Sequence, residues 1–497
     1  GLFRMFKKLF ILSLVMGVIG IAFVFHTDKG YRELEYRLGE QNSSWEFIQN
    51  TAESLDFIGW KNEKSIEKDQ TLKIVLTDKN WKKIKKYGTS HPPKKKWVKA
   101  QVLNGEDSLD VKVKLHGTNP AHYVDDKFSY TVKLKTPSSF LKSDRYKLLK
   151  GEEFFPAIIA LNNLAAKYGL ISPTSRMVEL ELNGKVMGHY SFGQDIRKDL
   201  INNFFGHKDW TIIANIEDWN RKEKINNPAH ISDFDLDYSH IKSTNDSCFG
   251  EALGVYRKVV ELISDEKFDS LSTFFDEQYM GKFLAFAYLF NDSHFLTGDN
   301  VKWIYNQKLQ KLYPVFRIET EGLSDRGILS TLDGKEVKNS YPYLDQSLWL
   351  SHQGYIGAKR QLIFKSLVKN EAIRHQRNLI FSEMIKNKDS LILDVKNVHT
   401  ESAPLMLKYG GLRRKYELRQ KTQLITLQEK LKVIKSYLKY NQVFYTHKKS
   451  KNTFEFTFDS FVRVRVEDSR GELFSKSSFN LGPNFERDYR SVEISSN

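Results

Sequence analysis

The sequence MVELELNGKVMGHY, residues 177–190, gives the clearest indication of local structure in the chain. Apolar and polar residues alternate from Val178 to Leu182, which is the pattern of a strand with one buried face. Asn183-Gly184 is a preferred dipeptide of two-residue hairpin turns, because both residues tolerate positive φ. Residues 186–190 then read as the returning strand. The stretch therefore predicts an antiparallel β-hairpin within the body of the protein.

Segments with strand and helix patterns surround this hairpin. Alternating apolar side chains predict strands upstream at 72–76, 97–103, 109–116 and 130–134. Apolar positions spaced by three and four predict helices at 155–168, 250–263, 280–290 and, after about residue 370, through most of the chain to Leu438. Alternation returns near the end, at Phe454–Phe458 and Val462–Val466. This mixture predicts an α+β protein.

The same patterns divide the chain into five expected parts. These are a transmembrane anchor at 1–27, a juxtamembrane helix and linker at 28–69, a main body at 70–370, a helical segment at 371–440, and a C-terminal β region at 441–497. Outside the anchor about 470 residues remain, enough for one large domain or for two to three ordinary domains.

The expected anchor is Leu9–Phe25, which contains no charged residue. As a helix it would span about 25 Å, near the short end for a membrane crossing. Arg4, Lys7 and Lys8 precede it, so the positive-inside rule places the N-terminus in the cytoplasm. A cleaved signal peptide is the alternative. We expect a single-pass protein of the bacterial inner (cytoplasmic) membrane, with a periplasmic or extracellular body.

Charge and cysteine content limit the partners and the chemistry. The net charge is +16, and Cys248 is the only cysteine, which excludes an intrachain disulfide and CxxC sites. A basic surface favours anionic partners: the membrane, a nucleotide phosphate or an anionic polysaccharide. The alternative to a binding role is that each run of lysines only forms a solvent-exposed face. Nucleic acid is the least favoured partner, because no nucleic-acid-binding motif is present.

Familiar catalytic motifs, namely the Walker loop, the GxSxG elbow and the HExxH helix, do not occur. Instead, several short motifs follow one another in a fixed order. They are Lys114–Asn119 (KLHGTN), Lys127–Lys133 (KFSYTVK), the hairpin at 182–190, Phe290–His294 (FNDSH) with Asn300, and Tyr313–Gly322 (YPVFRIETEG).

This order resembles the spore-coat-protein-H-like (CotH) kinase family over about residues 70–330. The resemblance implies a divergent protein-kinase-like fold that transfers the γ-phosphoryl group of ATP with a divalent metal, for which Mg²⁺ suits oxygen ligands. It further implies these roles: phosphate binding by Lys127 and Lys133, catalytic base for Asp292, and metal binding by Asn300 with Glu319 or Glu321.

The sequence also departs from the family pattern. His116-Gly117 stands where Arg-Gly is usual, Gln194 where glutamate is usual, and Ile318–Glu321 replaces a WDxD motif. In the alternative interpretation, Lys127 and Lys133 are simply exposed residues of a strand. Asp292 then only caps a turn.

Two functions therefore stay open. One is an active membrane-anchored phosphotransferase that acts on a protein or glycan. The other is a catalytically degenerate, pseudokinase-like scaffold or binding subunit of a cell-envelope assembly for surface polysaccharide. In that second case, the anchor and the C-terminal region would contact partner subunits.

Overall fold

The structure is a computed structural model. It describes residues 70–90, 93–104, 107–117, 122, 127–135, 141, 143–151, 155–215, 241–243, 248–290, 294–296, 301–318, 362–409, 413–439, 445–448, 453–457, 462–467, 473–481 and 490–493. The chain forms two compact units, each built from separate stretches of sequence. The first comprises Gly1–Pro156, Arg176–Gly193 and Val398–Lys421, and the second comprises Ala157–Ser175, Gln194–Asn397 and Thr422–Asn497.

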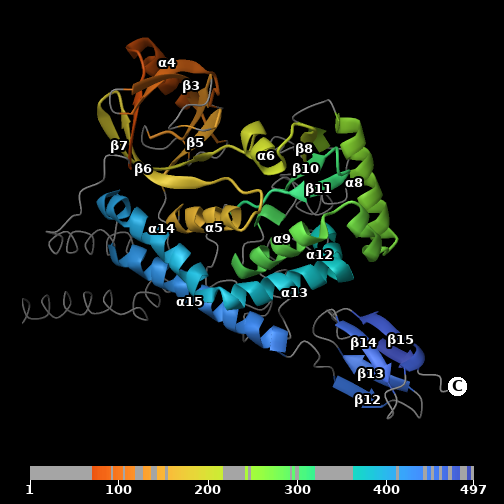
Figure 1. Ribbon diagram of the computed structural model, residues 1–497. Coiled ribbons are helices and arrows are strands. Elements are labelled where there is room, and N and C mark those ends of the chain that lie inside the picture. Colours follow the sequence, from red (N-terminus) through yellow and green to blue (C-terminus); the bar gives the residue numbers. More distant parts are fainter. Residues whose placement is uncertain are drawn as a thin grey trace, which may run out of the picture. The chain divides into compact units, whose positions relative to one another are not determined.

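The first unit contains a closed β-barrel (Figure 1). Its seven strands are β1 (Thr71–Val75), β2 (Val98–Asn104), β3 (Asp107–Leu115), β4 (Tyr130–Leu134), β5 (Arg145–Lys150), β6 (Ser175–Leu182) and β7 (Lys185–Gln194). They follow the order β1-β2-β3-β4-β5-β7-β6. The parallel pairing of β1 with β6, in which Thr71 lies opposite Glu179, closes the barrel.

The predicted hairpin is confirmed as β6 and β7. Asn183 and Gly184 form its turn with φ values of 50° and 76°, the positive values that a two-residue hairpin turn requires. Asn183 also fastens this turn to the end of β1. Its side-chain Oδ1 accepts a hydrogen bond from Leu76 N at 2.6 Å, and its N–H donates to Ile74 O at 2.9 Å.

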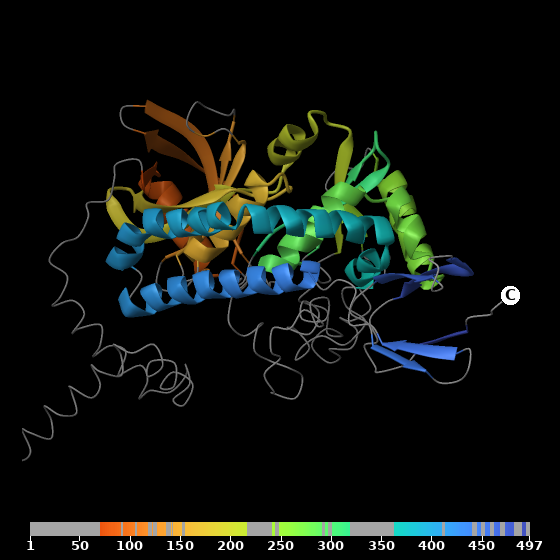
Figure 2. The same ribbon diagram turned by 60° about the horizontal axis from the view of Figure 1, so that its bottom comes forward.

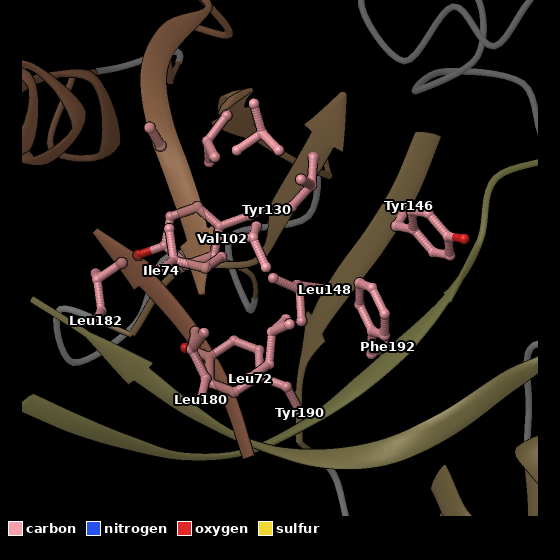
Figure 3. Packing of buried hydrophobic residues seen from close by; sticks show 14 of the residues in the cluster. Leu72, Ile74, Val102, Tyr130, Tyr146, Leu148, Leu180, Leu182, Tyr190 and Phe192 are labelled. Carbon is pink, nitrogen blue, oxygen red and sulfur yellow. The ribbon is translucent and has the colours of Figure 1, made fainter. Parts of the chain in front are cut away.

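Alternate residues of the barrel strands, apart from one irregularity in β7, face inward and form one apolar core. Figure 3 shows this packing, in which Tyr130 and Tyr190 are among the largest fully buried side chains. The rings of Tyr146 and Phe192 stack at 4.7 Å between centroids. Helix α4 (Asp78–Gly88) adds Ile84 to this core, and Thr77 caps the helix by accepting from Asn80 N.

A segment near the C-terminus completes the first unit. Helix α14 (Lys388–Tyr409) ends within it, and Lys408 Nζ lies 2.9 Å from Glu179 Oε2 on β6. Only 11% of the Glu179 side chain is exposed. A carboxylate with so little water around it depends on a paired cation.

The second unit contains an antiparallel sheet covered by helices. The sheet order is β11 (Lys311–Pro314), β10 (Lys302–Asn306), β8 (Trp210–Asn215) and β9 (Ile241–Ser243). The helical elements are α5 (Phe155–Lys167), α6 (Lys198–Phe205), α8 (Phe249–Ser264), η5 (Phe268–Thr273), α9 (Glu277–Phe290), η6 (His294–Leu296), α12 (Leu362–Lys369), α13 (Glu371–Lys386) and α15 (Arg413–Lys439), which begins in the first unit. The C-terminal strands are β12 (Tyr445–Lys448), β13 (Thr453–Thr457), β14 (Val462–Glu467), β15 (Leu473–Leu481) and β16 (Arg490–Glu493).

Helix α9 is the centre of this second unit. It is buried from Tyr279 to Phe290 except at Lys282, as expected of a helix that is apolar on all sides. Figure 2 shows α9 beside α13, which packs against it. The ring of Phe283 stacks on Phe364 of α12 at 5.4 Å. The helices predicted at 155–168, 250–263 and 280–290 are thus confirmed as α5, α8 and α9.

The predicted kinase-like fold class is wrong for the main body. The strands close into a barrel, and the pairing that closes them joins residues more than one hundred positions apart. Local alternation indicates a strand but does not indicate its partner, so the sequence patterns missed this closure.

The predicted membrane location also requires correction. Among the helices that the structure describes, none is long and apolar enough to cross a membrane. The two longest, α14 and α15, carry charged residues along their length. The proposed anchor, Leu9–Phe25, and the linker at 28–69 lie outside the described residues.

Candidate anion-binding site at one end of the barrel

Three of the motifs singled out in the sequence meet at one end of the barrel. His116 follows β3, Ser129 precedes β4, and His189 lies in β7. His116 N donates to Ser129 O at 2.9 Å, which joins the first two motifs. The consecutive residues Lys150 and Gly151, at the end of β5, join them to the third. Lys150 N donates to Ser129 Oγ at 2.9 Å, and Gly151 N donates to His189 O at 3.0 Å.

Ser129 is the centre of this arrangement. It is fully buried, and its backbone N–H donates to His122 O at 3.0 Å. Its hydroxyl accepts from Lys150 N and lies 2.9 Å from His122 Nδ1. A hydroxyl that accepts from a backbone N–H still has its own proton to donate. Donation of that proton to His122 Nδ1 leaves the imidazole proton on Nε2, the other ring nitrogen.

A second histidine and hydroxyl repeat the pattern. His116 Nδ1 lies 3.1 Å from the hydroxyl of Thr131, which is buried. The rings of His116 and His122 meet edge to face with 5.7 Å between their centroids. Each ring is thus held at its Nδ1 by one hydroxyl. Thr131 of β4 holds His116, and Ser129, which precedes β4, holds His122. This arrangement fixes the orientation of both imidazoles.

The tight packing of His122 depends on a glycine. Gly117 has a φ of 89°, and a Cβ placed there would lie 1.9 Å from His122 Cδ2. Any larger residue would therefore meet both an unfavourable backbone conformation and the imidazole ring. Glycine at position 117 lets the His122 ring lie directly against the backbone.

His189 takes its position from an irregularity in β7. Met187, Tyr190 and Phe192 all belong to the barrel core. Inward residues of a regular strand are two positions apart, whereas Met187 and Tyr190 are three positions apart. Gly188, between them, has a φ of 103°. One additional residue with a glycine at positive φ is the mark of a β-bulge, which turns a side chain to a new direction. The bulge places His189 against Gly151 at the end of β5.

Lysines surround these histidines. Burial lowers the pKa of His122, and the charges of Lys95, Lys147 and Lys150 lower it further. Burial, with a smaller contribution from Lys127, lowers the pKa of His189 to about 4. Both imidazoles are therefore neutral at pH 7 while the nearby lysines are cationic.

Such an arrangement is suited to an anion. Neutral imidazoles and hydroxyls supply hydrogen bonds of fixed direction, and the lysines supply positive potential from several elements. A metal cation is unfavourable beside these lysines. The described part of the chain contains no group of three or more histidine, cysteine or acidic side chains placed to hold a metal ion.

The residues predicted to meet phosphates are in different places. Lys127 is exposed and close enough to His189 to depress its pKa, so it lies at this site. Lys133 is exposed on the outer face of β4, at the opposite end of that strand from Ser129. Four residues of a strand extend about 13 Å, so Lys133 does not share the site with Lys127.

The predicted catalytic base and metal ligands, Asp292, Asn300, Glu319 and Glu321, lie outside the described residues. The chain is held firmly just before the last two. The buried side chain of Asn162 on α5 donates to Ile318 O at 3.0 Å and accepts from Ile318 N at 2.8 Å. The two hydrogen bonds fix the backbone at the start of the predicted acidic motif.

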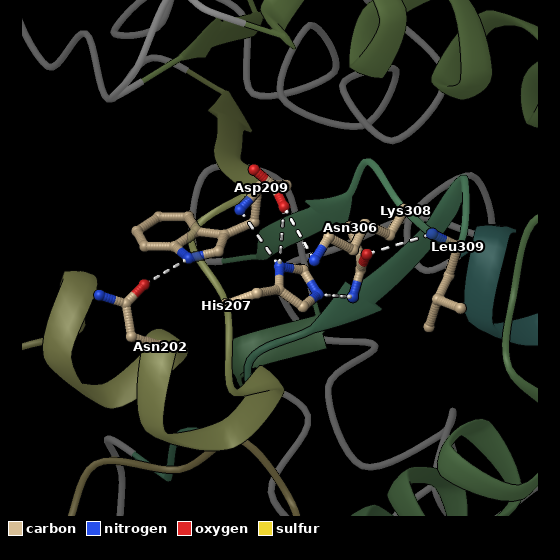
Figure 4. Close-up of polar contacts among 7 residues, drawn as sticks. Asn202, His207, Asp209, Asn306, Lys308 and Leu309 are labelled. Atoms are coloured by element: carbon tan, nitrogen blue, oxygen red, sulfur yellow. Dashed lines mark hydrogen bonds and ion pairs between the residues drawn. The ribbon is translucent and has the colours of Figure 1, made fainter.

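A second polar cluster, in the other unit, joins α6 to the sheet (Figure 4). His207 Nδ1 accepts from Asp209 N at 3.1 Å, and His207 Nε2 lies 3.3 Å from Asn306 Nδ2. Asp209 also pairs with Lys308 at 3.2 Å. Trp210 Nε1 donates to Asn202 of α6 at 2.8 Å. These groups satisfy one another, so the cluster has a structural role.

Sequence reasoning identified the motifs of the barrel site but missed four of its residues: His122, Lys147, Lys150 and Gly151. A recognisable signal existed for only one of them. His122 is a histidine close in sequence to the KLHGTN and KFSYTVK motifs. Lys150 and Gly151 end β5, a strand that was not predicted, and nothing in their local sequence marks them.

Comparison with known proteins adds no assignment to this geometry. No protein-family model matches the chain, and no curated protein is similar to it. Its functional interpretation therefore depends on the arrangement of its own residues.

Proposed function

We propose that the end of the barrel binds a small anionic ligand of the phosphate class, and that a nucleotide phosphate is the ligand with which the protein works. One observation carries this proposal: lysines from several segments surround neutral histidines whose orientation is fixed by Ser129 and Thr131. Lysine acts as a point charge toward phosphate, and directed N–H donors complete its hydrogen bonding.

The position of the glycines supports the same ligand. Gly117 and Gly151 lie directly against the rings of His122 and His189, so the histidines are packed tightly before any ligand arrives. Binding to such a site orders few side chains and therefore loses little conformational entropy. Only the exposed lysines, such as Lys127, need to be ordered.

Binding is tested by thermal unfolding and calorimetric titration of the full chain with inorganic phosphate, then with ATP with and without Mg²⁺. A ligand at about 100 times its Kd stabilises the folded protein by about 2.7 kcal/mol. Lys150→Gln and Lys127→Gln should each weaken binding several-fold. Lys185→Gln, which removes an exposed lysine at the β6–β7 turn of the same barrel, is the matched control and should bind as the wild type does.

If neither phosphate nor ATP stabilises the protein, the proposal is wrong. It is equally contradicted if Lys185→Gln weakens binding as much as Lys150→Gln does. Nonspecific attraction by a chain of net charge +16 would give that second result.

Phosphoryl transfer is the second candidate function. The observation that favours it is that three motifs of the CotH resemblance come together at one site. These motifs contain His116, Ser129 and His189. The test is incubation with ATP and Mg²⁺, with the γ-phosphoryl group followed into protein or glycan. Under this hypothesis Asp292→Asn abolishes transfer and retains ATP binding. ATP binding without any transfer would instead favour the hypothesis of a binding subunit.

A further inference from the structure

Four cations lie side by side across the outer face of the barrel. The strand registers place Lys99 of β2 opposite Lys112 of β3, Lys112 opposite Lys133 of β4, and Lys133 opposite Arg145 of β5. The three lysines are exposed, and Arg145 is partly exposed. We call these four residues the cationic row.

The cationic row is unfavourable for folding by itself. Like charges directly opposite each other on neighbouring strands repel, and the row contains three such pairs in succession. Within the described part of the chain, no carboxylate forms an ion pair with Lys99, Lys112 or Lys133. The positive charge of the three lysines is therefore available to a ligand that lies across the strands.

Trp97, two residues before Lys99 in the chain, is held by cations. Lys114 Nζ lies 4.8 Å from the centroid of the Trp97 ring, and the guanidinium of Arg145 lies 5.5 Å from it. These cation–π contacts order both basic side chains on the barrel surface. Arg145 thus belongs to the cationic row and to a preformed aromatic platform.

We propose that the cationic row binds an extended acidic polysaccharide, whose chain lies across β2, β3, β4 and β5. Neighbouring strands are about 4.8 Å apart, so the row presents positive charges at about that interval. A polymer with one carboxylate on each sugar unit can place successive charges along such a row. This surface is distinct from the anion site at the end of the barrel, because Lys112 precedes His116 by four residues, or about 13 Å of strand.

The surroundings of Trp97 favour an acidic polysaccharide over nucleic acid. Proteins that hold single-stranded nucleic acid stack its bases on aromatic side chains. The Trp97 ring already has Lys114 and Arg145 beside it, which hinders stacking of a base on those sides.

The test measures binding of the full chain to polygalacturonate, a linear polymer of carboxylated sugars. The variant Lys99→Gln/Lys112→Gln/Lys133→Gln should bind at least tenfold more weakly. The matched control, Lys79→Gln/Lys82→Gln/Lys83→Gln, removes three exposed lysines from α4 of the same unit and should change the Kd less than about twofold. Thermal unfolding confirms that both variants fold.

The outcomes separate this proposal from its alternatives. Equal loss of binding in both triple variants would show general charge attraction and overturn the proposal, as would failure of the wild type to bind polygalacturonate. A single-stranded oligodeoxynucleotide with the same number of charges should bind more weakly than polygalacturonate; tighter binding would overturn the choice of polymer. Lys150→Gln, in the barrel-end site, should retain polygalacturonate binding even if it loses phosphate.

Discussion

The imidazole of His189 occupies the volume that a side chain at position 151 would need. A Cβ on Gly151 would lie 2.1 Å from His189 Cδ2 and 2.3 Å from Nε2, both far inside van der Waals contact. Gly151→Ala should therefore displace the ring, reduce the free energy of unfolding by about 1–3 kcal/mol, and weaken phosphate binding. Urea denaturation and calorimetric titration measure the two effects.

A second glycine provides the control for this substitution. A Cβ on Gly254, in the middle of α8, would meet no atom within 4 Å. Gly254→Ala should stabilise the protein by about 0.5–1 kcal/mol, because alanine is the better helix former. Equal stability of Gly151→Ala and the wild type would contradict the close approach of His189.

Ser129→Ala should destabilise the barrel by about 1–3 kcal/mol, because it removes the hydroxyl and leaves buried polar groups without that partner. The hydroxyl contacts both His122 Nδ1 and Lys150 N, so the change should also loosen the His122 ring. Ser264→Ala is the control, since the hydroxyl of that exposed serine donates to Val260 O in its own helix. If Ser129→Ala is no more destabilising than Ser264→Ala, Ser129 does not organise the site.

Stability should fall as pH decreases from about 6.5 toward 4. The pKa of His189 is about 4 in the folded protein, whereas an unfolded histidine titrates near 6.5. Between these values the unfolded state binds more protons, so acid favours unfolding by up to about 3 kcal/mol. His189→Gln should flatten this part of the stability profile. Parallel profiles for the wild type and His189→Gln would refute the assignment.

Removing the central charge of the cationic row should stabilise the barrel. Lys112 lies between Lys99 and Lys133, so Lys112→Gln relieves two repulsive pairs and should raise the free energy of unfolding by about 0.2–1 kcal/mol. The gain should shrink at 1 M salt, where screening weakens the repulsion. Denaturation at low and high salt measures both. A loss of stability would mean that Lys112 makes favourable contacts that outweigh the repulsion.

A buried lysine in the second unit gives a prediction at higher pH. Lys430 of α15 is fully buried, with Nζ 4.4 Å from the centroid of the Tyr288 ring, and burial lowers its pKa to about 7. Between pH 7 and 10.5 the unfolded lysine binds more protons than the folded one, so this group makes stability rise with pH. Lys430→Met should be more stable than the wild type at pH 7, by on the order of 4 kcal/mol. The difference should decrease toward pH 10.5; a constant difference would mean that the gain has another cause.

The sequence predicted individual elements well where one local pattern determines them. The hairpin at 177–190 needed only its alternation and its Asn-Gly turn, and α9 needed only apolar residues at helical spacing. Strand β5 was missed, because Arg145–Lys150 has only Tyr146 and Leu148 to indicate a buried face. The kinase-like fold class was wrong because barrel closure depends on pairing between β1 and β6, which no local pattern encodes.

The barrel-end site was predictable in part. The motifs with His116, Ser129 and His189 were recognised as a set, and the structure brings them together. The role of Lys133 as a partner of Lys127 stays a prediction that the geometry does not favour, because alternation along β4 puts Lys133 on the outer face. Lys150 and Gly151 join the site through the pairing of distant strands, which sequence spacing alone does not reveal.

The barrel reaches its final form only after Lys408 has been synthesised, because Lys408 forms an ion pair with Glu179 of β6. Synthesis through Gln194 would produce all seven strands, yet more than two hundred further residues must follow before Lys408 emerges. Until then the barrel lacks the ammonium group that lies 2.9 Å from Glu179 in the finished protein. An expression fragment that stops after β7 would lack that ion pair. A fragment intended to isolate the barrel should therefore carry the second half of α14 as a fused or co-expressed segment.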